Sequence, residues 1–269
     1  MSINKDPYDL NGNFGNSRYY DDPATGKHIT SGKGGPSSTL FWNSPNYERA
    51  RERSNEFGGR SKWAALIKIS LSDIKHLMHE HCFNKIMAVG RLIQEKDEDG
   101  KQGFRTVSVK NFPEALSTID FNESHPFGSI IRLNYEIILS PDKKTVTLKI
   151  KGFIPGRDAR WVKKFFALRF YLVIAQVADM AFNPDTKIYQ PVVVDLELLS
   201  RCTFSDWIVR NSLPVDINLE ASFEMPAFTC PETVVVAALG VEFSTSMVMN
   251  QPYITPRSGS VAIVGCFTD

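Results

Sequence analysis

Hydrophobic and polar positions alternate with a period of two along most of the chain after about residue 104. In the segment from Val215 to Phe223, apolar residues at odd positions are separated by polar residues at even positions. Because successive side chains of a strand point to opposite faces, this pattern predicts one buried face and one solvated face. Similar segments follow one another without a helical pattern between them: IIRLNYEIIL, TVTLKIKGF, ALRFYLVIAQVA, YQPVVVDLELLS, TVVVAALGVEFS and SVAIVGCF. The sequence therefore predicts an antiparallel, immunoglobulin-like β-sandwich over residues 104–269.

Two details refine this prediction. The turn sequence SPDKK between the first two of these segments predicts a β-hairpin. The run VVVAALGV, residues 234–241, is apolar at every position, which is typical of a strand covered on both faces or facing a partner.

Residues 46–103 carry a helical pattern instead, so the whole fold is expected to be α+β, mainly β. Glu48, Glu52 and Glu56 recur at intervals of four on a charged helix face. Gly58-Gly59 is expected to end this helix, with Ser61 able to cap a second helix and Ser72 a third. An apolar stripe then continues through Ile74, Leu77, Met78, Cys82, Ile86, Val89, Leu92 and Ile93.

Residues 1–45 are rich in Gly, Asn, Ser, Asp and Tyr, and predict an extended polar arm. Such a stretch cannot by itself bury enough apolar area to offset the entropy of ordering it. The arm therefore either lies along its own domain or docks on a neighbouring subunit. The expected anchors are its large apolar and aromatic residues: Phe14, Tyr19, Tyr20, Leu40, Phe41 and Trp42.

Charge is distributed unevenly along the 269 residues, although the net charge is only +1. Residues 1–164 hold 26 Lys/Arg and 19 Asp/Glu, whereas residues 165–269 hold 5 and 11. A molecule with poles of opposite charge attracts copies of itself or presents one face to an anionic partner, unless both surfaces are merely solvated.

The four cysteines, Cys82, Cys202, Cys230 and Cys266, are scattered without a CxxC pair. This spacing argues against a zinc ribbon, and we interpret them as small hydrophobes in a reducing compartment. No apolar signal segment or run of membrane-spanning length is evident. We therefore expect a cytoplasmic or particle-associated protein without a membrane partner.

The segment from Tyr47 to Lys68 resembles a motif of a large family of uncharacterised Bacteroidetes proteins, an RTREN-x-x-EFG-like run followed by a Lys/Ala/Leu-rich helix. Arg53 stands where that family has Asn. A weaker likeness follows in GFIPGRDARW and the next strand, so the resemblance spans roughly residues 46–200. It implies a helical segment followed by a β-sandwich, and it transfers no activity or site residues. The matching positions are Arg49, Arg51, Glu52, Glu56, Phe57, Gly58, Lys62 and Ala64.

Candidate chemistry is sparse, and we expect no catalytic residue, cofactor or metal. The histidine cluster at 76–81, with Glu80 and Cys82, is the most metal-like feature. On one helix His76 would share a face with His79 and Glu80, which gives at most three converging ligands. Gly26-Lys27 and the 32–35 segment lack the remaining parts of a phosphate-binding loop, and no GxSxG nucleophile motif is present.

A basic run between residues 141 and 164 is the strongest partner signal, together with the arginines of the first helix. Such cations suit self-association with an acidic region, contacts with nucleic-acid phosphates supplemented by stacking on an aromatic ring, or simply a solvated strand edge. The candidate partner-binding residues are Arg49, Arg51, Arg53, Lys143, Lys144, Lys149, Lys151, Arg157, Arg160, Trp161, Lys163 and Lys164.

These observations lead to a functional hypothesis. We expect a non-enzymatic structural subunit that binds other copies of itself in a ring, tube or filament, as phage-like particles do. The alternative is a nucleic-acid-associated protein that uses the patch at 143–164. An enzyme or sugar-binding sandwich would require aromatic residues such as Trp207, Tyr253 or Tyr189 to line a groove.

Overall fold

The computed structural model describes residues 2–3, 11–22, 25–32, 34–160, 165–193, 200–224, 233–248 and 251–268. The chain is α+β and mainly β, and every strand pairing among the described residues is antiparallel, as the alternation predicted. It divides into two compact units, Met1–Arg51 and Glu52–Asp269.

The first unit, predicted as an extended polar arm, contains strands and short helices. Its strands form a four-stranded sheet in the order β1-β4-β3-β2, in which β2 and β3 are joined across Gly15, at a φ of 57°. Gly26-Lys27 lies in the connection from β3 to β4, so this Gly-Lys pair belongs to a hairpin. The elements are β1 (Ser2–Ile3), β2 (Gly12–Phe14), β3 (Ser17–Asp21), β4 (His28–Gly32), α1 (Ser38–Asn43), η1 (Pro45–Tyr47) and the start of α2 (Glu48–Ser70).

Helix α2 continues through Gly58-Gly59, so the predicted helix end and the second helix capped by Ser61 are both wrong. Tertiary packing is the reason. A Cβ at Gly59 would lie 2.6 Å from the ring of Tyr189, which shows that glycine here permits a close contact instead of ending the helix. One turn later, Trp63 is fully buried.

The expected third helix is split in two. A 3₁₀ helix, η2 (Ser72–Leu77), is followed by a short connection and then by α3 (Cys82–Glu95). The predicted apolar stripe is buried except for Leu92, which is 62% exposed. Helix α3 lies close to α2 where Gly90 faces Trp63, because a Cβ at Gly90 would come within 2.8 Å of the indole ring.

The predicted sandwich is present, with a layer of helices added to it. The larger sheet has the order β10-β7-β13-β14, with β11 paired to β7, and the smaller has the order β12-β6-β5. Hairpin β5–β6 is the one predicted around SPDKK. The bounds are β5 (Glu136–Leu139), β6 (Thr145–Phe153), β7 (Ala167–Ala178), β10 (Ser200–Phe204), β11 (Ile208–Val209), β12 (Val215–Ser222), β13 (Thr233–Val248) and β14 (Gln251–Phe267).

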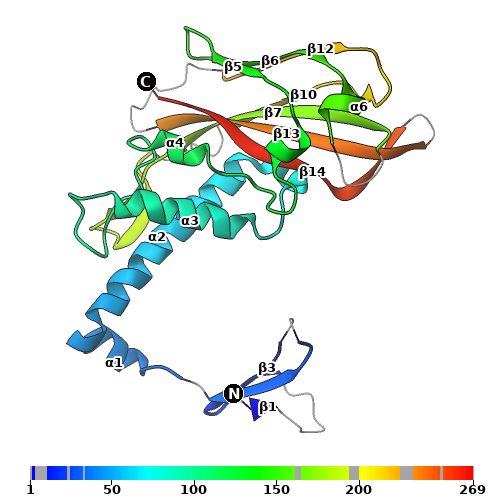
Figure 1. Ribbon diagram of the computed structural model, residues 1–269. Coiled ribbons are helices and arrows are strands. Elements are labelled where there is room, and N and C mark those ends of the chain that lie inside the picture. Colours follow the sequence, from blue (N-terminus) through cyan, green and yellow to red (C-terminus); the bar gives the residue numbers. More distant parts are fainter. Residues whose placement is uncertain are drawn as a thin grey trace. The chain divides into compact units, whose positions relative to one another are not determined.

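The central strands β7 and β13 are covered on both faces. One apolar cluster lies between the two sheets and includes Leu172 and Leu239. A second lies between the larger sheet and the helices and includes Val173 and Ala238. Figure 1 shows α3 on one side of the larger sheet and β5, β6 and β12 on the other. This arrangement explains why VVVAALGV is apolar at every position.

Short elements complete the second unit. A two-stranded sheet pairs β8 with β9, and Tyr189 of β9 is the residue that packs on Gly59. The segment 194–199, which the sequence predicted as the continuation of this strand, lies outside the described residues. The bounds are β8 (Met180–Asn183), β9 (Ile188–Pro191), α4 (Pro113–Leu116), α5 (Phe127–Ile130) and α6 (Pro155–Asp158).

Candidate functional site

The first unit exposes its large apolar side chains. Helix α1 begins after Ser37, whose Oγ accepts a hydrogen bond from the amide of Leu40, and none of its residues is buried. Leu40 is 49% exposed and Trp42 is 63% exposed, while Phe14 of the small sheet is 53% exposed. Between residues 11 and 51, no residue whose burial is described is buried, although these residues form a sheet and a helix.

Two of the predicted partner-binding arginines, Arg49 and Arg51, lie in this unit. The Arg51 guanidinium donates to the backbone carbonyls of Phe41 and Ser44, the latter at 2.9 Å. It therefore holds the turn between α1 and α2. The Phe41 ring contacts the rings of Trp42 and Tyr47, so this turn is organised around aromatic residues. We call residues Ser38–Arg51 the aromatic corner.

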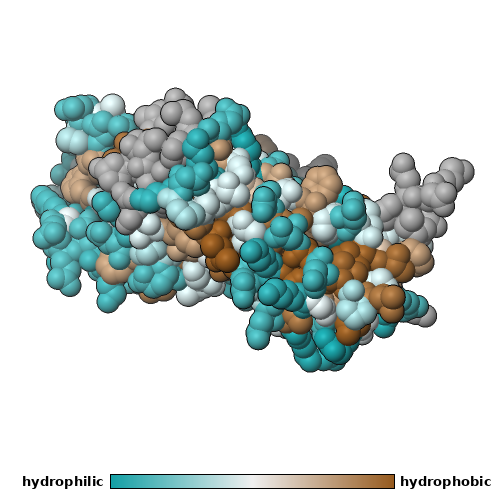
Figure 2. Space-filling model, turned by 90° about the horizontal axis from the view of Figure 1, so that it is seen from above, coloured by the Kyte–Doolittle hydropathy of each residue, from teal (hydrophilic) through white to brown (hydrophobic). Residues whose placement is uncertain are grey.

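The predicted basic patch is mixed with acidic residues. Lys149 and Lys151 are exposed on one face of β6, as the alternation predicted. Strand pairing, however, places Glu136 directly opposite Lys149 and Glu220 opposite Thr147 on the neighbouring strands. Figure 2, which views the molecule from the side of the smaller sheet, shows hydrophilic atoms together with apolar ones on this face.

The remaining cations of the run are arranged differently. Lys143 and Lys144 belong to the hairpin turn, where the Lys144 amide donates to Asp142. Arg157 forms a bidentate ion pair with Asp158 at 2.7 and 3.0 Å, and Arg160 is exposed. The described cations of the patch therefore have carboxylates among them. Trp161, Lys163 and Lys164 lie outside the described residues.

The histidine cluster does not share one helix. Because η2 ends at Leu77 and α3 begins at Cys82, His79 and His81 lie in the connection, and the helical geometry expected for them is wrong. Among the residues that the structure describes, no group of three or more His, Cys, Asp or Glu side chains is placed to hold a metal ion.

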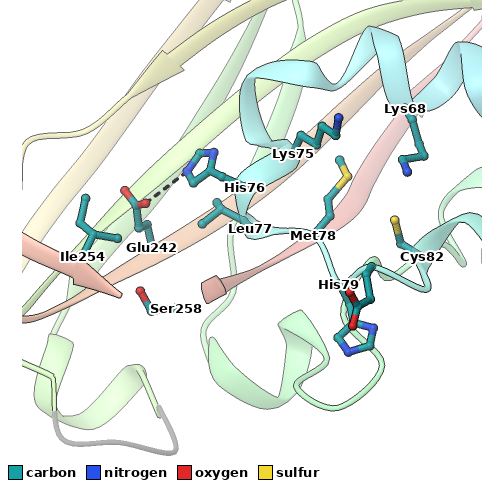
Figure 3. A pocket seen from close by; sticks show the side chains of 11 residues that line it. Lys68, Lys75, His76, Leu77, Met78, His79, Cys82, Glu242, Ile254 and Ser258 are labelled. Atoms are coloured by element: carbon teal, nitrogen blue, oxygen red, sulfur yellow. Dashed lines mark ion pairs between the residues drawn. The ribbon is translucent and has the colours of Figure 1, made fainter. Parts of the chain in front are cut away.

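His76 instead lines a cleft of about 620 Å³ between α2, η2, the start of α3 and the interior of strands β13 and β14. Figure 3 shows His76 and Glu242 pointing toward each other, with Cys82 and His79 beyond Leu77 and Met78. The cleft is therefore polar at two separate places. Burial raises the pKa of the Cys82 thiol, so this side chain is protonated at neutral pH and is a poor nucleophile.

Glu242 is the centre of the polar network at one end of the cleft. Glu242 is only 2% exposed. Its carboxylate accepts hydrogen bonds from Arg169 Nε and from the Tyr171 hydroxyl, both at 2.8 Å, and from His76 Nε2 at 3.2 Å. Burial by itself raises the pKa of this carboxyl, but the donated hydrogen bonds outweigh burial and hold the pKa below its usual value. Glu242 is thus a buried carboxylate that remains ionised.

Arg169 is held by aromatic rings as well as by Glu242. Its guanidinium lies 4.9 Å from the ring centre of Tyr171, 5.2 Å from that of Phe204 and 4.7 Å from that of Trp207. Of the three aromatics that an enzyme or sugar-binding sandwich would require along a groove, Trp207 thus packs on this arginine. Tyr253 is 55% exposed and Tyr189 is buried. The geometry supports a rigid, largely buried ion-paired network at this end of the cleft.

Sequence reasoning missed Glu242 and Arg169, because nothing near either residue in the sequence marks it. They are directly opposite each other on β13 and β7, and only the pairing of these strands brings them together. Arg53, in contrast, was predicted as a partner-binding residue. It lies in a second cavity, with arginines of α3 and of the following loop.

Among the described residues, no helix combines the length and apolar character that crossing a bilayer requires. Comparisons with family models, with curated proteins and with solved structures found no match to this chain.

Proposed function

We propose that the protein is a non-enzymatic structural subunit that binds other copies of itself through its first unit. The observation that carries this proposal is the sheet and helix between residues 11 and 51, in which no residue whose burial is described is buried. A module of this size without a core does not offset the entropy of ordering its backbone. Contact with a partner surface supplies the missing burial.

The aromatic corner is suited to such a contact. Trp42 and Leu40 are exposed on a helix whose ends are fixed, by the Ser37 cap and by Arg51. Rigid aromatic side chains lose little conformational entropy on binding and often contribute most of the energy of an interface. A second copy is the favoured partner because residues 1–164 and 165–269 carry net charges of opposite sign.

A contact between different surfaces of two copies is heterologous. It closes into a ring if the rotation between neighbours is suitable, and otherwise extends as a filament or tube. The alternative function, nucleic-acid binding through residues 143–164, has less support because Glu136 and Glu220 lie among the exposed lysines.

Light scattering coupled to size-exclusion chromatography tests the proposal. The full chain is expected to elute as an oligomer whose population increases with protein concentration. The double variant Leu40→Ser, Trp42→Ser should shift the population to monomer, because it removes two exposed apolar side chains of the aromatic corner.

Leu92→Ser is the matched control, since Leu92 is 62% exposed but belongs to the second unit and lies outside the acidic residues 165–269. This variant should associate as the wild type does. A wild-type chain that is monomeric at all concentrations, at both low and high salt, would exclude the proposed function. Negative-stain microscopy of the oligomer would distinguish rings from filaments.

A further inference from the structure

A cavity of about 470 Å³ between α2, α3 and the following loop is lined by four arginines, two glutamates and Gln102. Arg53 and Arg60 come from α2, Arg91 from α3 and Arg105 from the loop. Four guanidinium groups against two carboxylates leave a formal charge of +2. This volume is within the range of small-molecule sites.

Both carboxylates of the cavity already have an arginine partner. Glu56 accepts from Arg105 Nε at 2.7 Å and Nη2 at 2.9 Å, in a bidentate pair. Glu95 accepts from Arg91 Nε at 2.7 Å. Two of the four cations are therefore neutralised within the protein.

Arg53 and Arg60 make no ion pair with a carboxylate among the residues that the structure describes. Arg53 is exposed. Arg60 is partly buried, and its Nη1 donates to the Gln94 side-chain oxygen at 3.3 Å. Burial lowers the pKa of Arg60; the charge of Glu56, and to a lesser extent that of Glu95, opposes this shift, while the charges of Arg91 and Arg105 add to it. An anion between these guanidinium groups would offset this repulsion.

The walls of the cavity are held in place before any ligand arrives. Gln94 is fully buried and donates to the Arg105 carbonyl at 2.7 Å while it accepts from Arg60. The loop is fixed further by Asn55, which donates to the Gly103 carbonyl at 2.7 Å, and by Asp97, which accepts from the Thr106 amide at 2.6 Å. Such preorganisation reduces the entropy lost on binding.

We propose that this cavity binds a small phosphorylated ligand, whose phosphate oxygens accept hydrogen bonds from Arg53 and Arg60. Guanidinium groups match the geometry of phosphate better than ammonium groups, and four of them around one cavity favour a ligand with two or more negative charges. The inference is independent of self-association, because every residue that lines the cavity belongs to the second unit.

Isothermal titration of the full chain with pyrophosphate tests the inference. We expect wild-type protein to bind pyrophosphate, and Arg53→Gln to weaken binding at least tenfold, as expected for the loss of a charge-assisted hydrogen bond. Arg53 has no hydrogen bond to lose within the described structure, so the variant should fold normally, with an unchanged melting temperature without ligand. Arg60→Lys should also weaken binding, although it keeps the charge.

Lys149→Gln is the matched control, because it removes the same charge from the exposed face of β6. Its affinity for pyrophosphate should equal that of the wild type. Equal affinity of the wild type and Arg53→Gln would overturn the inference, and so would pyrophosphate binding no better than chloride at the same ionic strength. Binding of a single-stranded oligonucleotide but not of pyrophosphate would also overturn the inference, because the protein would then recognise a nucleic-acid polymer and not a small phosphorylated ligand.

Discussion

Replacing Glu242 by alanine is expected to lower the free energy of unfolding by about 3 kcal/mol. The substitution leaves the guanidinium of Arg169 and the hydroxyl of Tyr171 without their shared acceptor. Removing one partner of a buried charge pair costs about 3–5 kcal/mol, and the lower end applies because the Arg169 side chain remains 21% exposed to water. Urea denaturation of wild type and variant, followed by tryptophan fluorescence, measures the difference.

Glu220→Ala is the control for this experiment, because Glu220 is an exposed carboxylate on β12. Its effect should lie within about 0.5 kcal/mol of zero. If Glu242→Ala and Glu220→Ala had the same free energy of unfolding, the network around Glu242 would contribute no more to stability than an exposed surface carboxylate does.

The contribution of Glu242 to stability should depend on pH. Since its pKa in the folded protein lies below the unfolded value, the stabilisation is present at pH values above the unfolded pKa. It is lost as the pH falls through the folded pKa. The difference in unfolding free energy between wild type and Glu242→Gln should therefore be smaller in acid, below the folded pKa, than near neutral pH. A difference that grew as the pH fell would contradict this assignment.

Two neighbouring glycines of α2 are expected to respond to alanine in opposite directions. Gly59→Ala should destabilise the protein by about 1–3 kcal/mol, because the new Cβ would lie 2.6–2.8 Å from the ring of Tyr189. That ring cannot easily move, since it is buried and its hydroxyl donates to the Arg105 carbonyl at 3.0 Å.

Gly58→Ala should instead stabilise the protein by about 0.5–1 kcal/mol. A Cβ at Gly58 would have no heavy atom within 4 Å apart from its chain neighbours and the backbone of its own helix, so alanine adds helix propensity without a clash. Thermal and urea unfolding of both variants give the comparison. A stabilising Gly59→Ala would mean that Tyr189 does not pack on α2 as described.

These glycines also show where sequence reasoning fails. Gly58-Gly59 has the composition of a helix end, and only the contact with Tyr189, far away in sequence, explains why the helix continues. The same is true of Lys149, which belongs to a basic run in the sequence but faces Glu136 in the sheet. In both cases, a neighbour that the local sequence does not show is brought in by tertiary structure.

The strands were easier to predict, because burial imposes its own period on the sequence. Residues 215–222 alternate between apolar and polar, and in the structure their burial alternates in the same way on β12. The wholly apolar segment at 234–241 likewise indicated a strand covered on both faces. The sequence carries no comparable local signal for which strands pair with each other. The polar network of Glu242 depends on the pairing of β13 with β7 and therefore could not be predicted from the sequence.

The pairing of β7 with β13 has a consequence for how the chain is made. Residues 167–178 leave the ribosome well before residues 233–244, their partners in the sheet. Until the later strand has been synthesised, one side of a highly apolar β7 has no permanent neighbour. Forming contacts between segments so far apart in the sequence slows folding, and slow folding prolongs the exposure of apolar surface. Nascent chains of this protein should therefore need protection from aggregation, and slower translation at lower temperature should increase the soluble yield.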